Sequence, residues 1–442
     1  MNPWLGYLVI LGSLAVLLIF AGQITRRLHL SSEMARKIVH IGMGIICSCF
    51  PWLFTDSWPV MLLAGTAIFS LLVVRRCPLL RSSIGSSLHD VDRYSLGELY
   101  FPIAVAIVWF ISIAEPLYYS LSVLVLTLAD ALAALIGTKY GQKMYSTKEG
   151  YKTWEGSFSF FAVTFLCIHI PMLLLTGIGR EESVLIAILI AVLIMIIEAV
   201  AWNGLDNLFI PLSVCIFLKV YDTYTAGQLL SRLGLLLVIV LFLFALRRWL
   251  KLDDSALLAT SLFIFLVYKI GGWQWTIAPV VMFITYLSLE LREIQREERV
   301  HDIYALLAVS APGFFWLVLY SRFANGSFLY FYTVAYMAEL ICIYVAKWAF
   351  QYTNHSLTTI TLVSAVLGFF SIMIPFLLLT DMLFSWKMVL LSLFVAILSS
   401  QVFCYSQPHI RNCPLTTSRW MRQGLVGIGA SLTPMCFKLV LG

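Results

Sequence analysis

The stretch YYSLSVLVLTLADALAALIGT (residues 118–138) determines the kind of fold that this chain adopts. It is apolar apart from small hydroxyl side chains, two tyrosines and one charged residue, Asp130. An α-helix needs about 20 mostly apolar residues to cross the ~30 Å hydrocarbon core of a bilayer. We therefore interpret this stretch as a membrane span whose aspartate lies ~12 Å along the helix from Thr138.

The composition of the whole chain agrees with this interpretation. The 442 residues are 61% hydrophobic and 12% charged, with a mean hydropathy of +0.93, whereas soluble domains average about 45–50% apolar and about 25% charged residues. A soluble globular protein is excluded. The 14% aromatic residues and the nine scattered cysteines argue against disorder and against a disulfide framework.

About sixteen apolar stretches predict an all-α polytopic integral membrane protein with about 16 transmembrane helices. The stretch 207–219 is short, so a re-entrant or tilted helix is expected there. No signal-peptide pattern precedes the first span, which we interpret as an uncleaved helix. The expected spans are 4–22, 38–54, 58–74, 99–114, 118–138, 157–176, 184–202, 207–219, 229–246, 255–270, 273–290, 303–320, 327–349, 358–380, 386–404 and 424–441.

The basic residues predict the orientation. With the N-terminus outside and the spans alternating, 22 of the 29 Lys and Arg residues lie on one side. Positively charged loops stay cytoplasmic, so that side is the cytoplasm. The net charge of +6 therefore reports membrane orientation and not nucleic-acid binding. A bacterial inner membrane or an ER-type membrane is the expected location.

The distribution of polar residues predicts two modules. Up to about residue 220 the cytoplasmic loops carry glycines, lysines and carboxylates close to span ends, and beyond Arg248 they carry mostly flanking charge. The segment RRWLKLDD (247–254) is the expected boundary. We expect a first membrane domain over 1–250 and a second membrane module over 251–442.

Two motifs precede the quoted span on the cytoplasmic side. Helical spacing groups Arg36, Lys37 and His40 at the mouth of a span, where they could hold phosphate oxygens or simply flank the headgroups. In the segment 95–102 (SLGELYFP), Ser95 could cap a helix and form a capping box with Glu98. A functional role for Glu98 is the alternative.

Asp130 is the strongest single indication of function. A carboxylate inside a span costs ~2.5–3.5 kcal/mol on insertion scales and marks a functional site. Ala134, Gly137 and Gly141 follow at near-helical spacing and leave room for another backbone or a ligand. Helix packing alone would explain these small residues but not the aspartate.

The loop 143–157 has the composition of a phosphate cradle. It combines lysines, glycines and hydroxyls ahead of a span, and glycine N–H groups beside a lysine and a helix N-terminus bind phosphate. It does not match the Walker A pattern. A plain solvated loop is the alternative.

Three further polar residues complete the cytoplasmic set. Glu198 lies near the end of its span, and Asp206 and Asn207 follow the next turn. Carboxylate oxygens close to phosphate-binding cations are what a Mg²⁺–nucleotide site requires. Ordinary loop or helix-end charges are the alternative.

Five ordered blocks resemble the pattern of the polyprenol kinase family, which includes phytol, farnesol and dolichol kinases and CTP-dependent diacylglycerol kinases. The resemblance implies an integral-membrane kinase that transfers the γ-phosphate of a nucleotide, typically CTP, to the hydroxyl of a long-chain lipid alcohol. It covers about residues 30–220. The blocks are RKIVHIG (36–42), SLGELYFP (95–102), LADALAALIGTKYG (128–141), KTWEGS (152–157) and GLDNLFIP (204–211).

The residues and the resemblance together assign the expected site. Its partners are a lipid alcohol, a nucleoside triphosphate, Mg²⁺ and the lipid bilayer, without nucleic acid. The catalytic candidates are Asp130, Glu198 and Asp206, which with Asn207 are also the metal candidates. The nucleotide and phosphate candidates are Arg36, Lys37, His40, Lys139, Lys148, Lys152, Thr153, Glu155, Gly156 and Ser157, and Glu98, Gly137 and Gly141 complete the site.

The second module is similar only faintly to the start of the phytyl-phosphate kinase family, over about 252–283. That family's Asp-Thr-Trp and Asn-Gly-Gly blocks have no match, so we expect a non-catalytic, structural or lipid-binding module. Its one acid well inside a span, Glu339, could be paired with Lys347.

Two alternatives to a kinase stay open. A phosphatidate cytidylyltransferase would use the same nucleotide, but its C-terminal acidic signature is missing. An ion-coupled transporter would use Asp130 and Glu198 to carry protons or ions. Charges near mid-membrane would favour a transporter, whereas the polar residues here cluster on one face.

Overall fold

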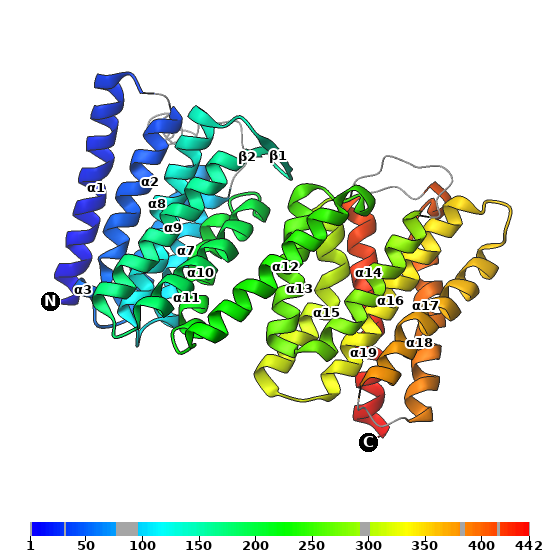
Figure 1. Cartoon of the computed structure of the whole chain (residues 1–442). Coiled ribbons are helices and arrows are strands. Elements are labelled where there is room, and N and C mark those ends of the chain that lie inside the picture. Colours follow the sequence, from blue (N-terminus) through cyan, green and yellow to red (C-terminus); the bar gives the residue numbers. More distant parts are fainter. Residues whose placement is uncertain are drawn as a thin grey trace. The chain divides into compact units, whose positions relative to one another are not determined.

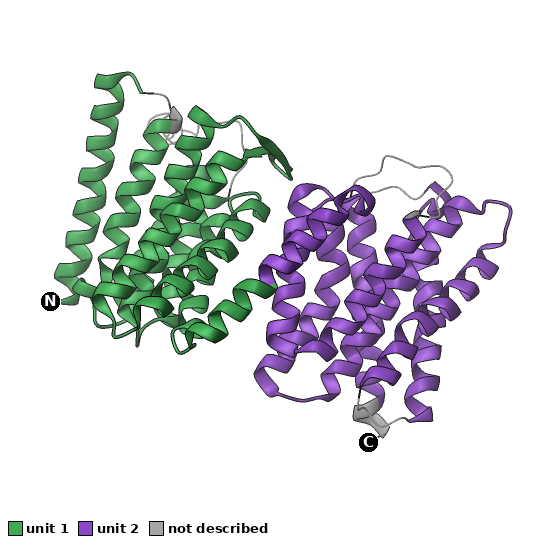
Figure 2. Cartoon of the chain, viewed as in Figure 1, with its two compact units in different colours: residues 1–235 green, residues 236–442 purple. Residues whose placement is uncertain are grey.

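The computed structural model describes residues 2–30, 32–76, 96–291, 301–380, 385–412 and 416–441. Within these ranges the chain is almost entirely helical, and its strands form one two-stranded hairpin. The chain divides into two compact units, residues 1–235 and 236–442 (Figure 2). The division falls inside helix α12, whose last residue is the expected boundary, Leu250.

Unit 1 is a helical bundle with the hairpin at one end. Its helices alternate in direction, so the loop after α1, the hairpin and the loop before α11 lie at the same end of the unit, opposite the N-terminus (Figure 1). The elements are α1 (Pro3–Leu28), α2 (Ser32–Ser48), α3 (Phe50–Leu53), α4 (Trp58–Arg76), α7 (Gly97–Ile111), α8 (Pro116–Tyr140), β1 (Met144–Thr147), β2 (Gly150–Thr153), α9 (Trp154–Leu175), α10 (Arg180–Val200), α11 (Asp206–Tyr221) and the first part of α12 (Ala226–Leu250).

Unit 2 is a second helical bundle built around one central helix. Helix α16 is buried along nearly its whole length and contacts α14, α15, α17, α18 and α19. Besides the end of α12, the elements are α13 (Asp254–Gly271), α14 (Trp273–Leu291), α15 (Ile303–Phe323), α16 (Ser327–Gln351), α17 (Leu357–Leu379), α18 (Trp386–Ser406), the 3-10 turn η1 (Ile410–Asn412) and α19 (Thr417–Leu441).

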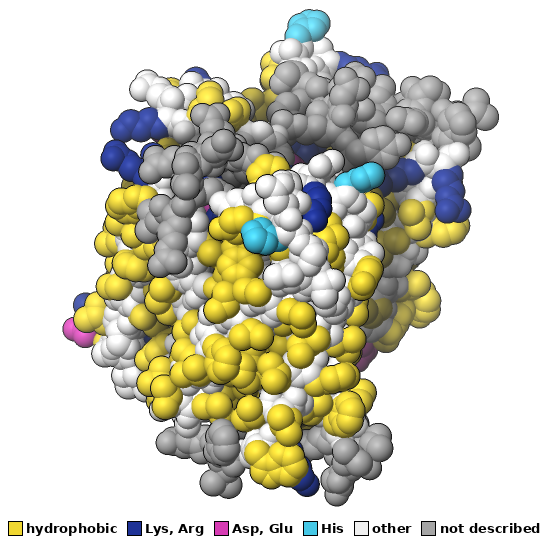
Figure 3. Space-filling view, turned by 90° about the vertical axis from the view of Figure 1, so that its right-hand side faces the viewer, with side chains coloured by type: hydrophobic (Ala, Val, Ile, Leu, Met, Phe, Trp, Pro, Cys, Tyr) yellow, Lys and Arg dark blue, Asp and Glu magenta, His cyan; other side chains and the backbone are white. Residues whose placement is uncertain are grey.

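The prediction of an all-α polytopic membrane protein is confirmed. Fifteen of the expected spans each fall on one helix, whereas 38–54 is divided between α2 and α3. Within the described ranges 11 helices are long and apolar enough to cross a membrane. The short stretch 207–219 is the 16-residue helix α11. On the face in Figure 3, hydrophobic side chains form a broad band with most of the visible Lys, Arg and His side chains above it. The count of sixteen crossings and their orientation stay predictions.

The sequence did not predict the hairpin. The segment expected to be a loop pairs as two antiparallel strands, with Tyr145 opposite Lys152 and Thr147 opposite Gly150. Gly150 has φ +123°, a backbone conformation that glycine adopts without steric cost. Thr153 ends β2 and is at once the N-cap of α9, so the hairpin leads directly into a span.

Candidate functional site

Two lysine–carboxylate pairs lie at the hairpin end of unit 1. The Lys37 ammonium donates to Asp130 Oδ2 at 2.7 Å and joins α2 to α8. The Lys152 ammonium donates to Glu198 Oε1 at 2.7 Å and also to the Glu198 backbone carbonyl, which joins β2 to α10. The Lys37 side chain is only 8% exposed and that of Glu198 12%. Both pairs are therefore largely withdrawn from solvent.

His40 is a second basic residue beside Asp130. Its Nε2 lies 3.7 Å from Asp130 Oδ2, and the imidazole is hydrogen-bonded to the backbone of Leu126. Lys37 and His40 are three positions apart and face the same way, whereas Arg36 is exposed on the helix surface. Of the three grouped basic residues, the structure brings two to the aspartate.

Asp206 links the two pairs electrostatically. The charges of Asp130, Lys152 and Glu198 all act on its carboxyl group, and the charge of Lys152 also acts on Asp130. We call Lys37, Asp130, Lys152, Glu198 and Asp206 the polar cluster. Five separate elements contribute to it, namely α2, α8, β2, α10 and the first residue of α11, which explains why it forms only in the folded bundle.

Asn207 is engaged with its neighbour. Its backbone N–H donates to Asp206 Oδ1 at 2.9 Å, and its side-chain amide lies 3.5 Å from the same oxygen. The side-chain amide group of Asn207 therefore lies beside Asp206 of the polar cluster, at the start of α11.

A glycine allows α2 to approach α8 closely enough for the first pair. A Cβ atom at Gly44 would lie 1.8 Å from Thr127 Oγ1, one turn of α8 before Asp130. Only glycine fits there without displacing the threonine. Small residues at such contacts let membrane helices pack closely, and here the contact places Lys37 and His40 beside Asp130.

The small residues after Asp130 serve helix packing. A Cβ at Gly137 would lie 2.9 Å from Thr153 Oγ1, and one at Gly141 would lie 2.4 Å from Thr153 Cγ2. Thr153 caps α9 by accepting a hydrogen bond from the Gly156 N–H at 3.2 Å. These residues, expected at a nucleotide site, hold α8 against the start of α9 and so position Lys152.

Four other candidates of the hairpin region lie outside the polar cluster: Lys139, Lys148, Glu155 and Ser157. The Tyr145 hydroxyl and Ser157 Oγ are 2.8 Å apart and buried, and Glu155 accepts from the Lys143 backbone N–H at 3.3 Å. Lys139 and Lys148 are exposed. Their positive charges therefore lie at the surface of the same end of unit 1.

Glu98 lies in a separate contact. Its carboxylate is 3.6 Å from the Arg75 guanidinium of α4. The N-cap residue of α7 is Leu96, and Ser95, the expected partner in a capping box, lies outside the described residues. The structure thus places Glu98 in an ion pair at the first turn of α7.

Sequence reasoning missed Asn203. Its backbone carbonyl accepts from the Leu96 N–H at 3.3 Å and its N–H donates to Glu149 Oε1, so it joins α7, the hairpin and the loop before α11. Asn203 has φ +53° and Gly204 has φ +78°. The Asn-Gly dipeptide was the available signal, because it is typical of tight turns.

The charge state of Lys152 follows from its surroundings. Burial lowers the pKa of the ammonium, but the charge and hydrogen bond of Glu198 outweigh burial and raise that pKa above its ordinary value. Lys152 is therefore protonated at neutral pH. It provides a permanent positive charge next to three carboxylates.

The chemistry of the oxygen donors fits a magnesium ion. Within the described residues, no three His, Cys, Asp or Glu side chains already form a closed metal site. Mg²⁺ usually keeps several waters and binds through one or two carboxylates plus substrate phosphates. The carboxylates of Asp130 and Asp206 act on each other at this end of the bundle, and a divalent cation would offset their like charge.

In unit 2 the pairing differs from the expectation. Lys347 donates to Glu290 Oε1 at 2.9 Å, and Lys251 lies 2.7 Å from Glu290 Oε2. Glu339, fully buried, accepts from Gln423 Nε2 at 2.8 Å. The suggested Glu339–Lys347 pair was wrong, because Lys347 lies two turns nearer the helix end, where Glu290 of α14 meets it.

These features define a polytopic helical membrane protein with a partly buried cluster of lysines and carboxylates at one end of its first unit. The chain is similar to a phytol kinase of Synechocystis sp., at 30% identity over 198 residues, 44% of this chain and 82% of that protein. It is also similar to a probable phytol kinase 2, chloroplastic, of Glycine max, at 25% identity over 216 residues, 47% of this chain and 71% of that protein.

The chain therefore belongs to the polyprenol and phytol kinase-like family, and the resemblance of its sequence blocks is confirmed. No family model and no solved structure matches it.

Proposed function

We propose that this protein is a lipid-alcohol kinase that transfers the γ-phosphate of CTP, with Mg²⁺, to the hydroxyl of a long-chain isoprenoid alcohol such as phytol, farnesol or a dolichol-like alcohol. The polar cluster carries the proposal, since it brings residues of four sequence blocks together in a chain whose relatives are named phytol kinases. The reaction takes place at the cytoplasmic end of unit 1.

Phosphoryl transfer asks a protein mainly to position its substrates and to neutralise charge. The alcohol oxygen bonds to the γ-phosphorus while the bond from that phosphorus to the β–γ bridging oxygen breaks. CDP leaves, and the hydroxyl proton must be accepted. Asp130 is suited to accept it, because Lys37 and His40 hold Oδ2 while Oδ1 has no hydrogen bond among the described residues.

The lysines of the polar cluster are suited to the phosphates. Lys152 stays protonated at neutral pH and can neutralise γ-phosphate charge, and Lys37 places a second positive charge beside Asp130. The oxygens of Glu198, Asp206 and Asn207, with Asp130, would hold Mg²⁺. When bound, this ion neutralises charge on the β- and γ-phosphate oxygens.

The test is transfer by the purified full chain. Labelled CTP, ATP and GTP are each offered with phytol, farnesol, a dolichol, or diacylglycerol, in Mg²⁺ or in EDTA, and labelled lipid is measured. We expect Mg²⁺-dependent labelling of an isoprenoid alcohol, with CTP the best donor. Glu115→Gln is the matched control, because it removes an ion pair, with Lys219 at 2.8 Å, from the opposite end of unit 1.

Two results would contradict the proposal. One is the absence of labelled lipid with every donor and acceptor in a folded preparation. The other is release of pyrophosphate with formation of a CDP-lipid, which would indicate a cytidylyltransferase.

A further inference from the structure

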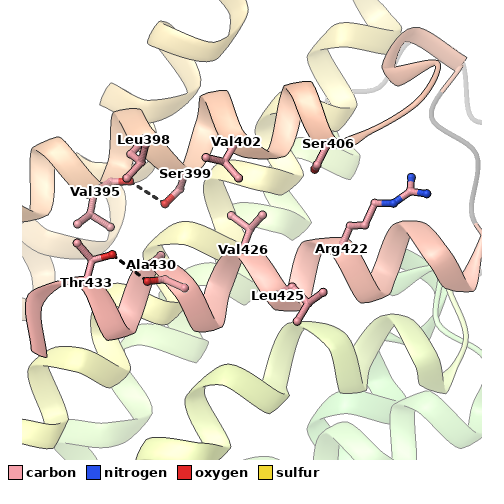
Figure 4. A pocket seen from close by; sticks show the side chains of 11 residues that line it. Val395, Leu398, Ser399, Val402, Ser406, Arg422, Leu425, Val426, Ala430 and Thr433 are labelled. Atoms are coloured by element: carbon pink, nitrogen blue, oxygen red, sulfur yellow. Dashed lines mark hydrogen bonds between the residues drawn. The ribbon is translucent and has the colours of Figure 1, made fainter. Parts of the chain in front are cut away.

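A groove lies between α18 and α19 of unit 2. It encloses about 410 Å³, within the range of ~300–1,000 Å³ typical of ligand sites. Its walls are apolar over most of its length, and Arg422 lies at one end while Val395 and Thr433 lie at the other (Figure 4). The groove is thus apolar along its length and charged at one end.

The hydroxyl groups along the groove are already satisfied. Ser399, Ser406 and Thr433 each donate to a backbone carbonyl of their own helix, at 2.7, 2.9 and 2.9 Å. These side chains therefore offer the groove little beyond their carbon atoms. Arg422 is the charged residue among those that line it.

Arg422 has more N–H donors than the one that it uses in a hydrogen bond among the described residues. Its Nη1 donates to Gln407 Oε1 at 3.3 Å, longer than the roughly 2.7–2.9 Å of a strong charge-assisted bond. A guanidinium carries five N–H donors in a planar fork that matches a phosphate group. Charge and geometry at this end of the groove therefore suit a phosphate.

Gly429 leaves the floor of the groove open. A Cβ atom there would have no neighbour within 4 Å, and the residue is exposed. From Arg422 to Thr433 the groove follows α19 for ~16 Å, at 1.5 Å per residue. That is about half of the ~30 Å hydrocarbon core, so a chain can lie along it from the membrane boundary inwards.

We propose that this groove binds a single-chain lipid monophosphate, with the phosphate at Arg422 and the chain along α18 and α19. The ligand class rests on the proposed function, whose product is such a lipid. One apolar groove with one cationic end accommodates one chain and one phosphate, whereas a diacyl phospholipid would leave a second chain outside. The second unit is then a binding module for the product class.

Photo-crosslinking of the purified full chain tests the proposal. The probe is phytyl monophosphate carrying a diazirine on its chain, and the labelled peptides are identified by mass spectrometry. We expect labels on α18 and α19, and competition by unlabelled phytyl monophosphate at least about tenfold stronger than by phytol, equivalent to ~1.4 kcal/mol. Equal competition by phytol, by phosphatidic acid or by inorganic phosphate would overturn the proposal.

Two matched pairs of variants locate the ligand. Arg422→Gln should weaken probe binding about tenfold or more, whereas Arg322→Gln, at the opposite end of unit 2, should not. Gly429→Leu fills the groove and should abolish labelling of α18 and α19, while Gly234→Leu, equally open on α12, should have no effect. Unchanged labelling in both groove variants would refute the site.

A kinase assay on the same preparations separates the two proposals. The probe already carries its phosphate, so its binding does not need phosphoryl transfer. Labelled lipid without groove labelling would refute the groove and leave the kinase standing. Groove labelling without any lipid phosphorylation would refute the kinase and leave the lipid-phosphate site standing.

Discussion

Lys37 is an ammonium group held almost entirely inside a membrane protein, with 6% of the residue exposed. A lone charge in such a place would be costly, and its partner Asp130 would be costly as well. Their 2.7 Å contact offsets part of both costs. The same contact places a positive charge beside the carboxylate that the proposed reaction uses.

Asp130→Asn should lower phosphoryl transfer about 10²- to 10⁴-fold, the usual contribution of a positioned acid or base. It also leaves Lys37 without its counter-charge, and breaking a buried pair costs about 3–5 kcal/mol. The double variant Lys37→Met/Asp130→Asn should recover thermal stability without recovering transfer. Near wild-type turnover in either protein, measured with labelled CTP and phytol, would show that this carboxylate is not catalytic.

His301, in the segment before α15, makes the stability of unit 2 depend on pH. Burial and the charge of Arg419, with that of Lys251, lower the pKa of the imidazole to about 4 against the opposing charges of Glu290 and Asp302. The unfolded chain, with a histidine pKa of about 6.5, binds the proton more readily. The stability that neutral His301 contributes is therefore fully present above pH ~6.5 and lost as the pH falls towards 4.

We expect wild-type stability to fall by about 3 kcal/mol more than that of His301→Gln between pH 7 and pH 4. Thermal unfolding of both proteins across this range measures the difference. His355→Gln, in an exposed loop, is the control and should follow the wild type. Parallel curves for wild type and His301→Gln would contradict the assignment.

Pairs of helices, held by small residues, bring the cluster's side chains within reach of one another. Between membrane helices close packing replaces the hydrophobic drive of water-soluble folds. Gly44 against Thr127 sets the approach of α2 to α8, and Gly137 and Gly141 against Thr153 set that of α8 to the hairpin and α9. Substitution at these glycines should act on the site without touching its charges.

Gly44→Ala should lower both thermal stability and transfer. Its Cβ would meet Thr127 Oγ1 at 1.8 Å, and overpacking of this kind costs about 1–3 kcal/mol. Gly44→Ala/Thr127→Ala should recover most of the loss, because the obstructing atoms belong to a side chain. Gly65→Ala, with no neighbour within 4 Å, is the control and should be neutral or slightly stabilising.

An unaffected Gly44→Ala protein, or a double variant no better than the single one, would show that this contact does not set the position of α2. Thermal unfolding measures the stability of each variant, and initial rates on the same preparations measure its phosphoryl transfer.

The two units have different polar interiors. Unit 1 brings three carboxylates together with two lysines, whereas unit 2 has two lysines, Lys251 and Lys347, on the single carboxylate of Glu290. The buried Glu339 of unit 2 is bound to Gln423, and the charge of Arg419 acts on it. If the catalytic groups all belong to unit 1, replacing Glu339 with a neutral residue should leave the rate of phosphoryl transfer unchanged.

Glu339→Gln is expected to keep transfer within about twofold of the wild type. The amide has nearly the shape of the carboxyl group and can still accept from Gln423. Labelled-lipid formation is compared at matched expression and thermal stability. A strong loss of transfer would refute a non-catalytic unit 2, and loss of a lipid diphosphate made by the wild type would indicate a two-step kinase.

The orientation of the whole chain can be tested with single cysteines, in a background without the native ones. Tyr151→Cys on the hairpin and Thr353→Cys after α16 should react only from the cytoplasmic side. Gly177→Cys and Gly326→Cys should react only from outside. All four positions are exposed, so a membrane-impermeant thiol reagent reaches them. Reaction of position 151 from outside would contradict a cytoplasmic site.

The sequence by itself determined the membrane class and the positions of nearly all the helices, and it identified Asp130 as a candidate functional residue. Hydropathy and span length are local properties, and a carboxylate inside an apolar stretch is visible without knowing its neighbours. The order of the five blocks also indicated the family, since each block is a short contiguous run.

Only the tertiary structure decided which side chains meet. Lys37 pairs with a residue 93 positions away and Lys152 with one 46 positions away, and neither spacing follows from helical periodicity. Thr153 and Gly156 carry the composition of a phosphate cradle, yet they cap and pack α9. Such assignments depend on how closely two helices approach, which is set by steric contact between distant residues and cannot be read along one chain.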